Sequence, residues 1–283
     1  MQLCSDILPL ENRLAQRDLP KLPTVMHQRW EELLFLHWTF EPQIIAKILP
    51  PRLRVETFED KAWVGVVPFS MRNVRPRFLP SVPGISNFPE LNLRTYVVDE
   101  HGRPGVWFYS LDTPKRLPNW IARTFFHLNY RLARIQIEEK GSLRFYRSEL
   151  WMDTEWDTPQ EYKWERVGKP FTAEPGSLDF FLAERYRLFA FNKKENQLMS
   201  GQVHHEPYHL QKVNLKCYSK RLFALNGLPE PGNSPVSGIS NASLPNSTIL
   251  GKQEYKSKKS ISSIFHFAMD NAFSPISLIA LDL

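Results

Sequence analysis

Proline is spread through this chain of 283 residues, and its frequency constrains the fold more than any other feature. The sequence contains 23 prolines and only 12 glycines. Proline cannot donate a backbone hydrogen bond and breaks helix interiors, so the elements between prolines must be short, which excludes a bundle of long helices. Aromatic residues, which favour strands, make up 13% of the chain. We therefore expect a mainly β fold.

Charge and cysteine content exclude several classes of protein. A net charge of +6 would suggest nucleic-acid binding if the basic residues clustered, but they occur in scattered pairs such as Arg75/Arg77. The two cysteines, Cys4 and Cys217, are too far apart for a redox or metal motif. The chain shows neither the basic start and apolar core of a signal peptide nor an apolar run of transmembrane length. We expect a cytoplasmic protein without nucleic-acid or membrane partners.

Short apolar runs predict a series of strands separated by turns. Proline at 42 opens a predicted short helix, Ser177 caps another, and the spacing of apolar residues over 118–134 indicates a third. Residues 72–89 contain four prolines and are predicted to form a long structured loop. The expected strands are 33–40, 53–58, 62–69, 91–98, 105–111, 135–140, 143–151, 186–191, 199–204 and 210–217.

Composition divides the chain into three parts. Residues 1–25 are polar and interrupted by proline, which predicts a loosely ordered arm. Residues 26–228 carry the apolar runs and are expected to form a single domain. From 229 to 283 the chain is first rich in Ser, Asn, Pro and Gly and then in Lys and Ser, which predicts a disordered or weakly docked tail.

The segment His205-Glu206-Pro207-Tyr208-His209 matches the zinc-protease string H-E-x-x-H. That motif requires a helix, which brings both histidines to one face. Proline inside the segment breaks such a helix, so we expect no metal site. His205 is instead predicted to be structural or to line a pocket as a hydrogen-bonding group. The sequence offers no other cofactor motif.

Three polar residues occupy alternate positions of one predicted strand. Glu90, Asn92 and Arg94 share a face, because side chains alternate along a strand. Leu91 and Leu93 lie on the opposite face. The polar face either lines a cavity or forms the solvated outer side of an amphipathic strand.

Pro114-Lys115-Arg116-Leu117 follows the apolar run 105–111 and places a lysine directly beside a second cation. Repulsion from Arg116 and partial desolvation would both lower the pKa of Lys115. A neutral lysine is a nucleophile that forms Schiff bases with carbonyl compounds. The alternatives are a turn with two solvated cations, or an Arg116 neutralised by Asp112.

Several segments together resemble the YqjF-like family, a bacterial family of unknown function. The resemblance covers roughly residues 25–230, and the chain departs from the family pattern after Gly232, as a frameshifted or replaced C-terminus would. It implies the fold of acetoacetate decarboxylase: α+β but mainly β, a cone-shaped antiparallel β-barrel with a few packed helices. The segments are 62–69, 90–97, 105–112, 184–186 and 204–211.

The resemblance also implies a site. Pro114-Lys115-Arg116-Leu117 is similar to the Pro-Lys-Lys-Leu segment of acetoacetate decarboxylase that carries its Schiff-base lysine. Glu90 resembles a pocket glutamate of that enzyme, and Arg29 resembles an arginine near its chain start. The implied function is a lyase or decarboxylase acting on a small oxo acid without a cofactor.

In this hypothesis Lys115, Arg116 and Glu90 are catalytic, and the substrate is bound by Arg29, Asn92, Arg94 and His205. The alternative is a non-catalytic barrel that binds a small ligand or has a structural role. A homo-oligomer is compatible with both.

Overall fold

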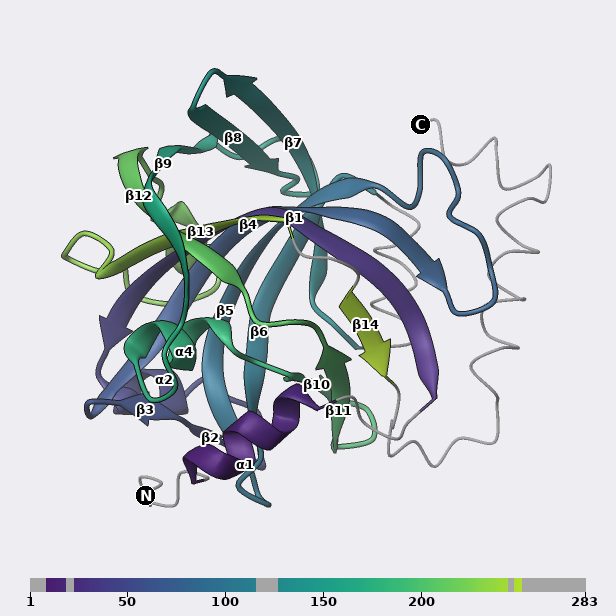
Figure 1. The fold of residues 1–283 in the computed structure, drawn as a ribbon, viewed down its shortest axis with the longest axis vertical. Helices are drawn as coiled ribbons and strands as arrows, with labels where there is room; N and C mark the ends of the chain where they lie inside the picture. The colour runs from purple at the N-terminus through teal and green to yellow at the C-terminus, as the bar shows by residue number, and fades with distance from the viewer. Residues whose placement is uncertain (1–8, 19–22, 116–126, 244–246, 251–283) are drawn as a thin grey trace.

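The computed structural model describes residues 9–18, 23–115, 127–243 and 247–250 (Figure 1). Strands dominate this part of the chain, and the helices are short. The helical segments are α1 (Leu10–Leu14), the 3-10 helix η1 (Ala15–Arg17), α2 (Pro42–Ala46), α4 (Leu178–Ala183) and α5 (Arg221–Ala224). The strands are β1 (Thr24–Phe40), β2 (Leu53–Val55), β3 (Thr57–Phe58), β4 (Lys61–Pro76), β5 (Phe88–Asp99), β6 (Pro104–Thr113), β7 (Tyr130–Lys140), β8 (Leu143–Leu150), β9 (Gln160–Thr172), β10 (Arg187–Asn192), β11 (Gln197–His204), β12 (His209–Cys217), β13 (Ser237–Ser243) and β14 (Ser247–Leu250).

The sheet closes on itself because β1 pairs with strands on both of its edges. β1 pairs with β4 on one side and with β13 on the other. The result is a closed nine-strand barrel. Its strands run in the order β1, β4, β5, β6, β7, β8, β9, β12 and β13. The predicted mainly β barrel with a few packed helices is confirmed.

Four strands of this barrel also belong to a second ring. Beyond its pairing with β5, β6 pairs in parallel with β10. The ring continues through β11 and β14 and returns to the first half of β1. β1, β4, β5 and β6 therefore form a wall that the two rings share (Figure 1).

Each face of the shared wall carries its own core, because side chains alternate along the strands. Inside the nine-strand barrel, Leu36, Val66 and Leu93 pack with rings from β8 and β9 and with Phe223 of α5. On the other face, Phe35, Val67 and Phe69 pack against Phe180 of α4 and against Tyr208. β5 is consequently buried on both faces over most of its length.

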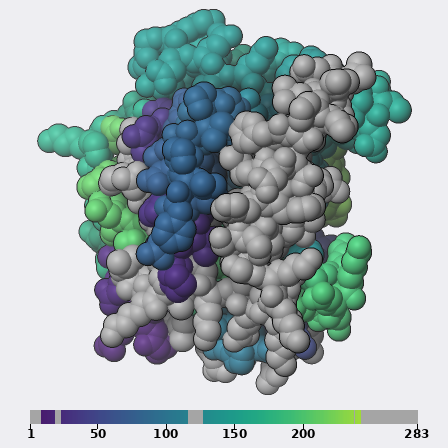
Figure 2. Space-filling model, turned by 90° about the vertical axis from the view of Figure 1, so that its right-hand side faces the viewer, coloured from purple at the N-terminus to yellow at the C-terminus, as the bar shows by residue number. Residues whose placement is uncertain are grey.

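Several predicted boundaries are corrected. β4 runs on to Pro76 and pairs with the first half of β1, so the predicted loop 72–89 is shorter than expected. The end of this β4–β5 connection forms the blue region of the surface in Figure 2. Strand β9 was not predicted, and Tyr130–Arg134 begins strand β7 although helical spacing was expected there. The rest of that predicted helix lies mostly outside the described residues.

The predicted tail supplies two strands of the body. β13 pairs with β1 and β12, and β14 pairs with β1 and β11. β13 and β14 therefore complete the two rings, and the expected domain boundary at 228 falls too early. Residues 251–283 lie outside the described part of the chain. Within the predicted N-terminal arm, α1 and η1 are tied to the body by ion pairs of Arg13 and Arg17.

The helix of 178–183 forms as predicted, and the Ser177 side chain accepts a hydrogen bond from the Phe180 backbone N–H. In the described segments, no helix is both long enough and apolar enough to span a bilayer.

Gly105 permits the parallel pairing that closes the second ring. A Cβ atom at this position would lie 2.8 Å from the carbonyl oxygen of Arg187 and 2.7 Å from Cε2 of Phe189. The backbone oxygen cannot move without separating β6 from β10, so we expect Gly105→Ala to lower the free energy of unfolding by about 1–3 kcal/mol. The measurement is urea denaturation. Gly232→Ala, where a Cβ meets no atom within 4 Å, is the control, and an equal loss in both variants would contradict this account.

Candidate functional site

Glu90 is a buried carboxyl group near the start of β5, with a relative exposure of 2%. The hydroxyl of Tyr130 donates a hydrogen bond of 2.8 Å to its Oε2 atom. Tyr130 reaches this carboxyl because β7 begins beside the end of β6, with Tyr130 paired to Leu111. The Asn92 side chain, on the same face of β5, also hydrogen-bonds to Glu90. Both partners are neutral.

The surroundings of Glu90 favour a protonated carboxyl. Burial raises the pKa of Glu90 to about 7, and the nearby charge of Asp112 adds to this effect. The hydrogen bonds from Tyr130 and Asn92 act in the opposite direction but do not cancel the burial. Burial and the charge of Glu90 hold the pKa of Tyr130 well above its usual value, so its hydroxyl remains a donor. Glu90 can therefore accept or release a proton near neutral pH.

Lys115 lies at the same end of the sheet as Glu90. Leu91 pairs with Asp112, so Thr113 is the next residue across from Glu90 and Lys115 follows two residues later. Lys115 is half-buried, and among the described residues it makes no hydrogen bond or ion pair. The hydroxyl of Thr113 is buried and also has no partner in the described part of the chain. Arg116 lies outside the described residues.

Asp112 is on the opposite face of the sheet and is already paired. Arg131 binds both of its carboxylate oxygens, with Nε–Oδ1 and Nη2–Oδ2 distances of 2.7 and 3.0 Å. Arg131 also donates to Ser110. The carboxylate that the sequence offered as a partner for Arg116 is therefore held by Arg131.

Asn92 and Arg94 continue the polar face of β5, and this face is buried rather than solvated. The Oδ1 atom of Asn92 has no hydrogen-bond partner among the described residues. Arg94 donates to the carbonyl oxygen of Leu182 at 3.1 Å and to the hydroxyl of Tyr96 at 3.3 Å. Its guanidinium group is thus directed toward α4, away from Glu90.

Arg29 is not brought into this interior. Trp30 packs edge-on against Phe69 on the Glu90 side of the wall, so the preceding residue points to the other face of β1. The side chain of Arg29 is 45% exposed and forms an ion pair with Glu31. Arg29, predicted to bind the substrate, is therefore not brought together with Glu90.

His205 is buried in the segment between β11 and β12. Its Nδ1 atom lies 2.7 Å from the carbonyl oxygen of Glu206, and its ring stacks on Tyr186 at 4.5 Å between centroids. Burial lowers the pKa of His205, which favours the neutral ring. The segment 205–208 is not helical, and the described residues contain no group of three or more ligands suited to a metal ion.

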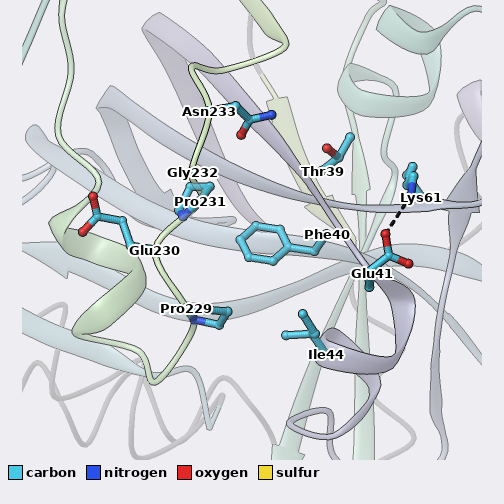
Figure 3. Close-up of a pocket in the computed structure, with 10 residues that line it drawn as sticks. All are labelled: Thr39, Phe40, Glu41, Ile44, Lys61, Pro229, Glu230, Pro231, Gly232 and Asn233. Atoms are coloured by element: carbon cyan, nitrogen blue, oxygen red, sulfur yellow. Dashed lines mark hydrogen bonds and ion pairs between the residues drawn. The ribbon is translucent and has the colours of Figure 1, made fainter.

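A separate surface pocket of about 320 Å³ lies at the end of β1. Figure 3 shows the Phe40 ring at its centre, between Ile44 and the segment Pro229–Asn233, and the ion pair of Glu41 with Lys61 at one side. That ion pair is exposed, and the charges of Glu41 and Lys61 compensate each other. The pocket therefore lacks the buried, unpaired groups that mark the region around Glu90.

Tyr130 is the residue of this site that the sequence did not reveal. Helical spacing over 118–134 concealed the start of β7, and the parallel pairing with β6 joins residues separated by the connection 114–129. Glu90 could be predicted as a site residue because alternation along a strand is a local signal. Its tyrosine partner could not be predicted, because its position depends on long-range strand pairing.

Comparison with known proteins identifies relatives of uncharacterised function. Residues 27–243 match the family DUF2071, described as an uncharacterised conserved protein. The chain is 38% identical over 212 residues to the uncharacterised protein YqjF of Bacillus subtilis strain 168, covering 75% of this chain and 86% of YqjF.

Solved structures show the same fold at low sequence identity. Acetoacetate decarboxylase from Legionella pneumophila has a TM-score of 0.55 at 14% identity, covering 89% of this chain and 97% of its own. The enduracididine biosynthesis enzyme MppR, complexed with the condensation product of pyruvate and imidazole 4-carboxaldehyde, has a TM-score of 0.54 at 14% identity, covering 92% and 99%. These similarities establish the acetoacetate-decarboxylase-like fold.

The raised pKa of Glu90 predicts a pH-dependent stability difference. An unfolded glutamate releases its proton near 4.5, whereas folded Glu90 does so near 7. Between these values the folded state binds more protons, so this group makes stability fall as the pH rises, and the effect is constant above about 7. Glu90→Gln abolishes this dependence. Its free energy of unfolding relative to wild type should rise by roughly 3 kcal/mol from pH 4.5 to 8.

Denaturant titrations at several pH values measure this difference. Glu138→Gln is the matched control, because that carboxylate is exposed and paired only with Lys140. A difference between Glu90→Gln and wild type that stays constant with pH would show that folding does not raise the pKa of Glu90.

Proposed function

The chain belongs to the DUF2071 family, and from this premise and the chemistry of its interior we propose that it is a lyase-type enzyme for a small oxo acid. Lys115 forms a Schiff base with the carbonyl group of the substrate. Glu90 transfers the proton that the reaction requires. Arg116 is the neighbouring cation in the sequence.

The observation that carries the proposal is the state of Glu90. A carboxyl whose pKa lies at about 7 serves equally well as a proton donor and acceptor at neutral pH. Its hydrogen bonds to Tyr130 and Asn92 fix its orientation without adding charge. Lys115, which follows Thr113 at this end of the sheet, has the flexible stem that a nucleophilic amine requires.

The Nζ atom of neutral Lys115 attacks the carbonyl carbon of a 3-oxo acid, whose carboxylate is separated from the carbonyl by one carbon, and loss of water gives a protonated imine. The C–C bond to the carboxylate breaks, carbon dioxide leaves, and the electron pair enters the imine to form an enamine. Glu90 protonates the enamine carbon. Water then hydrolyses the imine, which releases the carbonyl product and Lys115.

Structural relatives support this substrate class. Acetoacetate decarboxylase shares the fold. Another structure of MppR is described as complexed with pyruvate, at a TM-score of 0.52 and 14% identity. An aldol or dehydration step through the same imine is equally consistent with Lys115 and Glu90. The proposal is therefore a Schiff-base lyase, with decarboxylation as its simplest form.

A non-catalytic small-ligand-binding barrel is the alternative, and the placement of Arg29 favours it. Arg29 faces away from Glu90 and pairs with Glu31, and Arg94 is directed toward Leu182. Neither is free to bind a substrate carboxylate beside Lys115. Under this alternative Asn92 and Glu90 bind a polar ligand and Lys115 forms no covalent bond.

Borohydride reduction in the presence of pyruvate separates the two functions. We expect wild-type protein to gain the mass of one pyruvic acid less one oxygen atom, because the imine on Lys115 is reduced to a stable amine. Intact-mass spectrometry and peptide mapping locate the adduct. Lys115→Ala should lose it, whereas Lys169→Ala, at an exposed lysine, should retain it. Absence of an adduct in wild type, or equal adduct in Lys115→Ala, contradicts the mechanism.

Glu90→Gln should separate binding from proton transfer. We expect the variant to retain the borohydride-trapped adduct. Its kcat for the decarboxylation of an oxo acid should be lower by roughly 10²–10⁴-fold, the usual contribution of a general acid. In wild type kcat should fall as the pH rises above about 7, the pKa of Glu90, because the protonated carboxyl is the reacting form. The pH–rate profile of the variant should lack this limb. An unchanged profile would assign the proton transfer to another group.

A further inference from the structure

A second buried cluster lies farther along the same face of β5 and is strongly charged. Arg94 and Tyr96 contribute from β5, His37 from β1, and Arg185 from the segment after α4. All four are buried. The Nε2 atom of His37 lies 2.7 Å from the Tyr96 hydroxyl. The guanidinium carbons of Arg94 and Arg185 lie 5.6 and 4.8 Å from the centre of the Tyr96 ring.

The positive charges of this cluster exceed its negative charges. Arg13 and Arg185 form ion pairs with a single carboxylate, Glu56. Arg17 forms an ion pair with Glu184. Arg94 has no carboxylate partner among the described residues. Four guanidinium groups therefore share two carboxylates, which leaves two positive charges without a counter-charge.

Some N–H donors of these guanidinium groups also lack a hydrogen-bond partner in the described part of the chain. Among the described residues, Nε of Arg94 and Nη2 of Arg185 and Arg17 are buried without hydrogen-bond partners. The hydroxyl of Tyr96 donates to the carbonyl oxygen of Leu182 at 2.8 Å. The protein itself thus offers neither a charge nor an acceptor to these atoms.

Such an arrangement is costly unless something binds to it. A buried charge without a partner costs several kcal/mol, and burial lowers the pKa of Arg13 and Arg185 to about 9. A bound anion would compensate the charge and accept hydrogen bonds from the free guanidinium N–H groups. Rings of Phe35 and Phe181 pack against Arg94 and Arg185, which restricts the anion to a small one.

We propose that a small anion, a halide or a short carboxylate, binds between Arg94 and Arg185. The site is distinct from that of Lys115, because Arg94 is four residues from Glu90, about 13 Å along an extended strand. The ion pairs of Arg13 and Arg17 hold α1 and η1 over this cluster. The bound anion therefore stabilises the attachment of the N-terminal arm to the barrel.

Anion-dependent stability tests the proposal. The protein is exchanged into a buffer whose only anion is the bulky HEPES, and chloride or formate is added during urea denaturation. Above half-saturation, each tenfold rise in anion concentration should raise the folding equilibrium constant of wild type tenfold. Arg94→Gln should lose this slope. Arg77→Gln, at an exposed arginine that packs on Phe78, should retain it. The slopes measured with chloride and with formate are compared, which distinguishes a halide site from a carboxylate site.

Bromide gives a second readout that does not depend on the folding of any variant. An anomalous-scattering peak between the guanidinium groups of Arg94 and Arg185 in crystals of wild-type protein grown with bromide supports the site. Equal slopes for wild type and Arg94→Gln, or no bromide peak at a stabilising concentration, overturns it. Lys115→Ala should keep the full response, so failure of the Schiff-base mechanism would leave this result unaffected.

Discussion

The structure depends on one constraint, which is that β1, β4, β5 and β6 form a wall shared by two closed rings. The central part of this wall is buried on both faces, so the polar side chains there must find their partners inside the protein. β5, at the centre, carries Glu90, Asn92, Arg94 and Tyr96 on one face, and all are buried. The closure of the sheet thus turns a row of ordinary polar residues into groups with altered chemistry.

Two carboxyl groups near this wall differ in their hydrogen-bond partners, and the partners influence the pKa of each group. Burial also raises the pKa of Asp112 on the barrel side, but Nε and Nη2 of Arg131 bind its two carboxylate oxygens and oppose that rise. Glu90, on the other side, has only the neutral Tyr130 and Asn92. Burial without a counter-charge brings its pKa close to neutral pH, and this difference makes Glu90 the candidate for proton transfer.

The fold class, and the strands that carry the site, could be predicted because their signals are local. Short apolar runs indicated β5 and β6, and alternation placed Glu90 and Arg94 on one face. Long-range pairing left no such signal. Residues 237–243 and 247–250 form strands that pair with β1, β11 and β12, despite a composition typical of a linker. Arg29 resembled a pocket residue, but the alternation that packs Trp30 against Phe69 turns it outward.

The central claim is that Lys115 and Glu90 act on one substrate in one interior. The most direct measurement is a crystal structure of the protein after borohydride reduction with pyruvate. The account predicts continuous density from Nζ of Lys115 to the reduced substrate, with the carboxyl group of Glu90 within hydrogen-bonding distance of the adduct. An adduct on another lysine, or one on Lys115 that points to solvent away from Glu90, would contradict it.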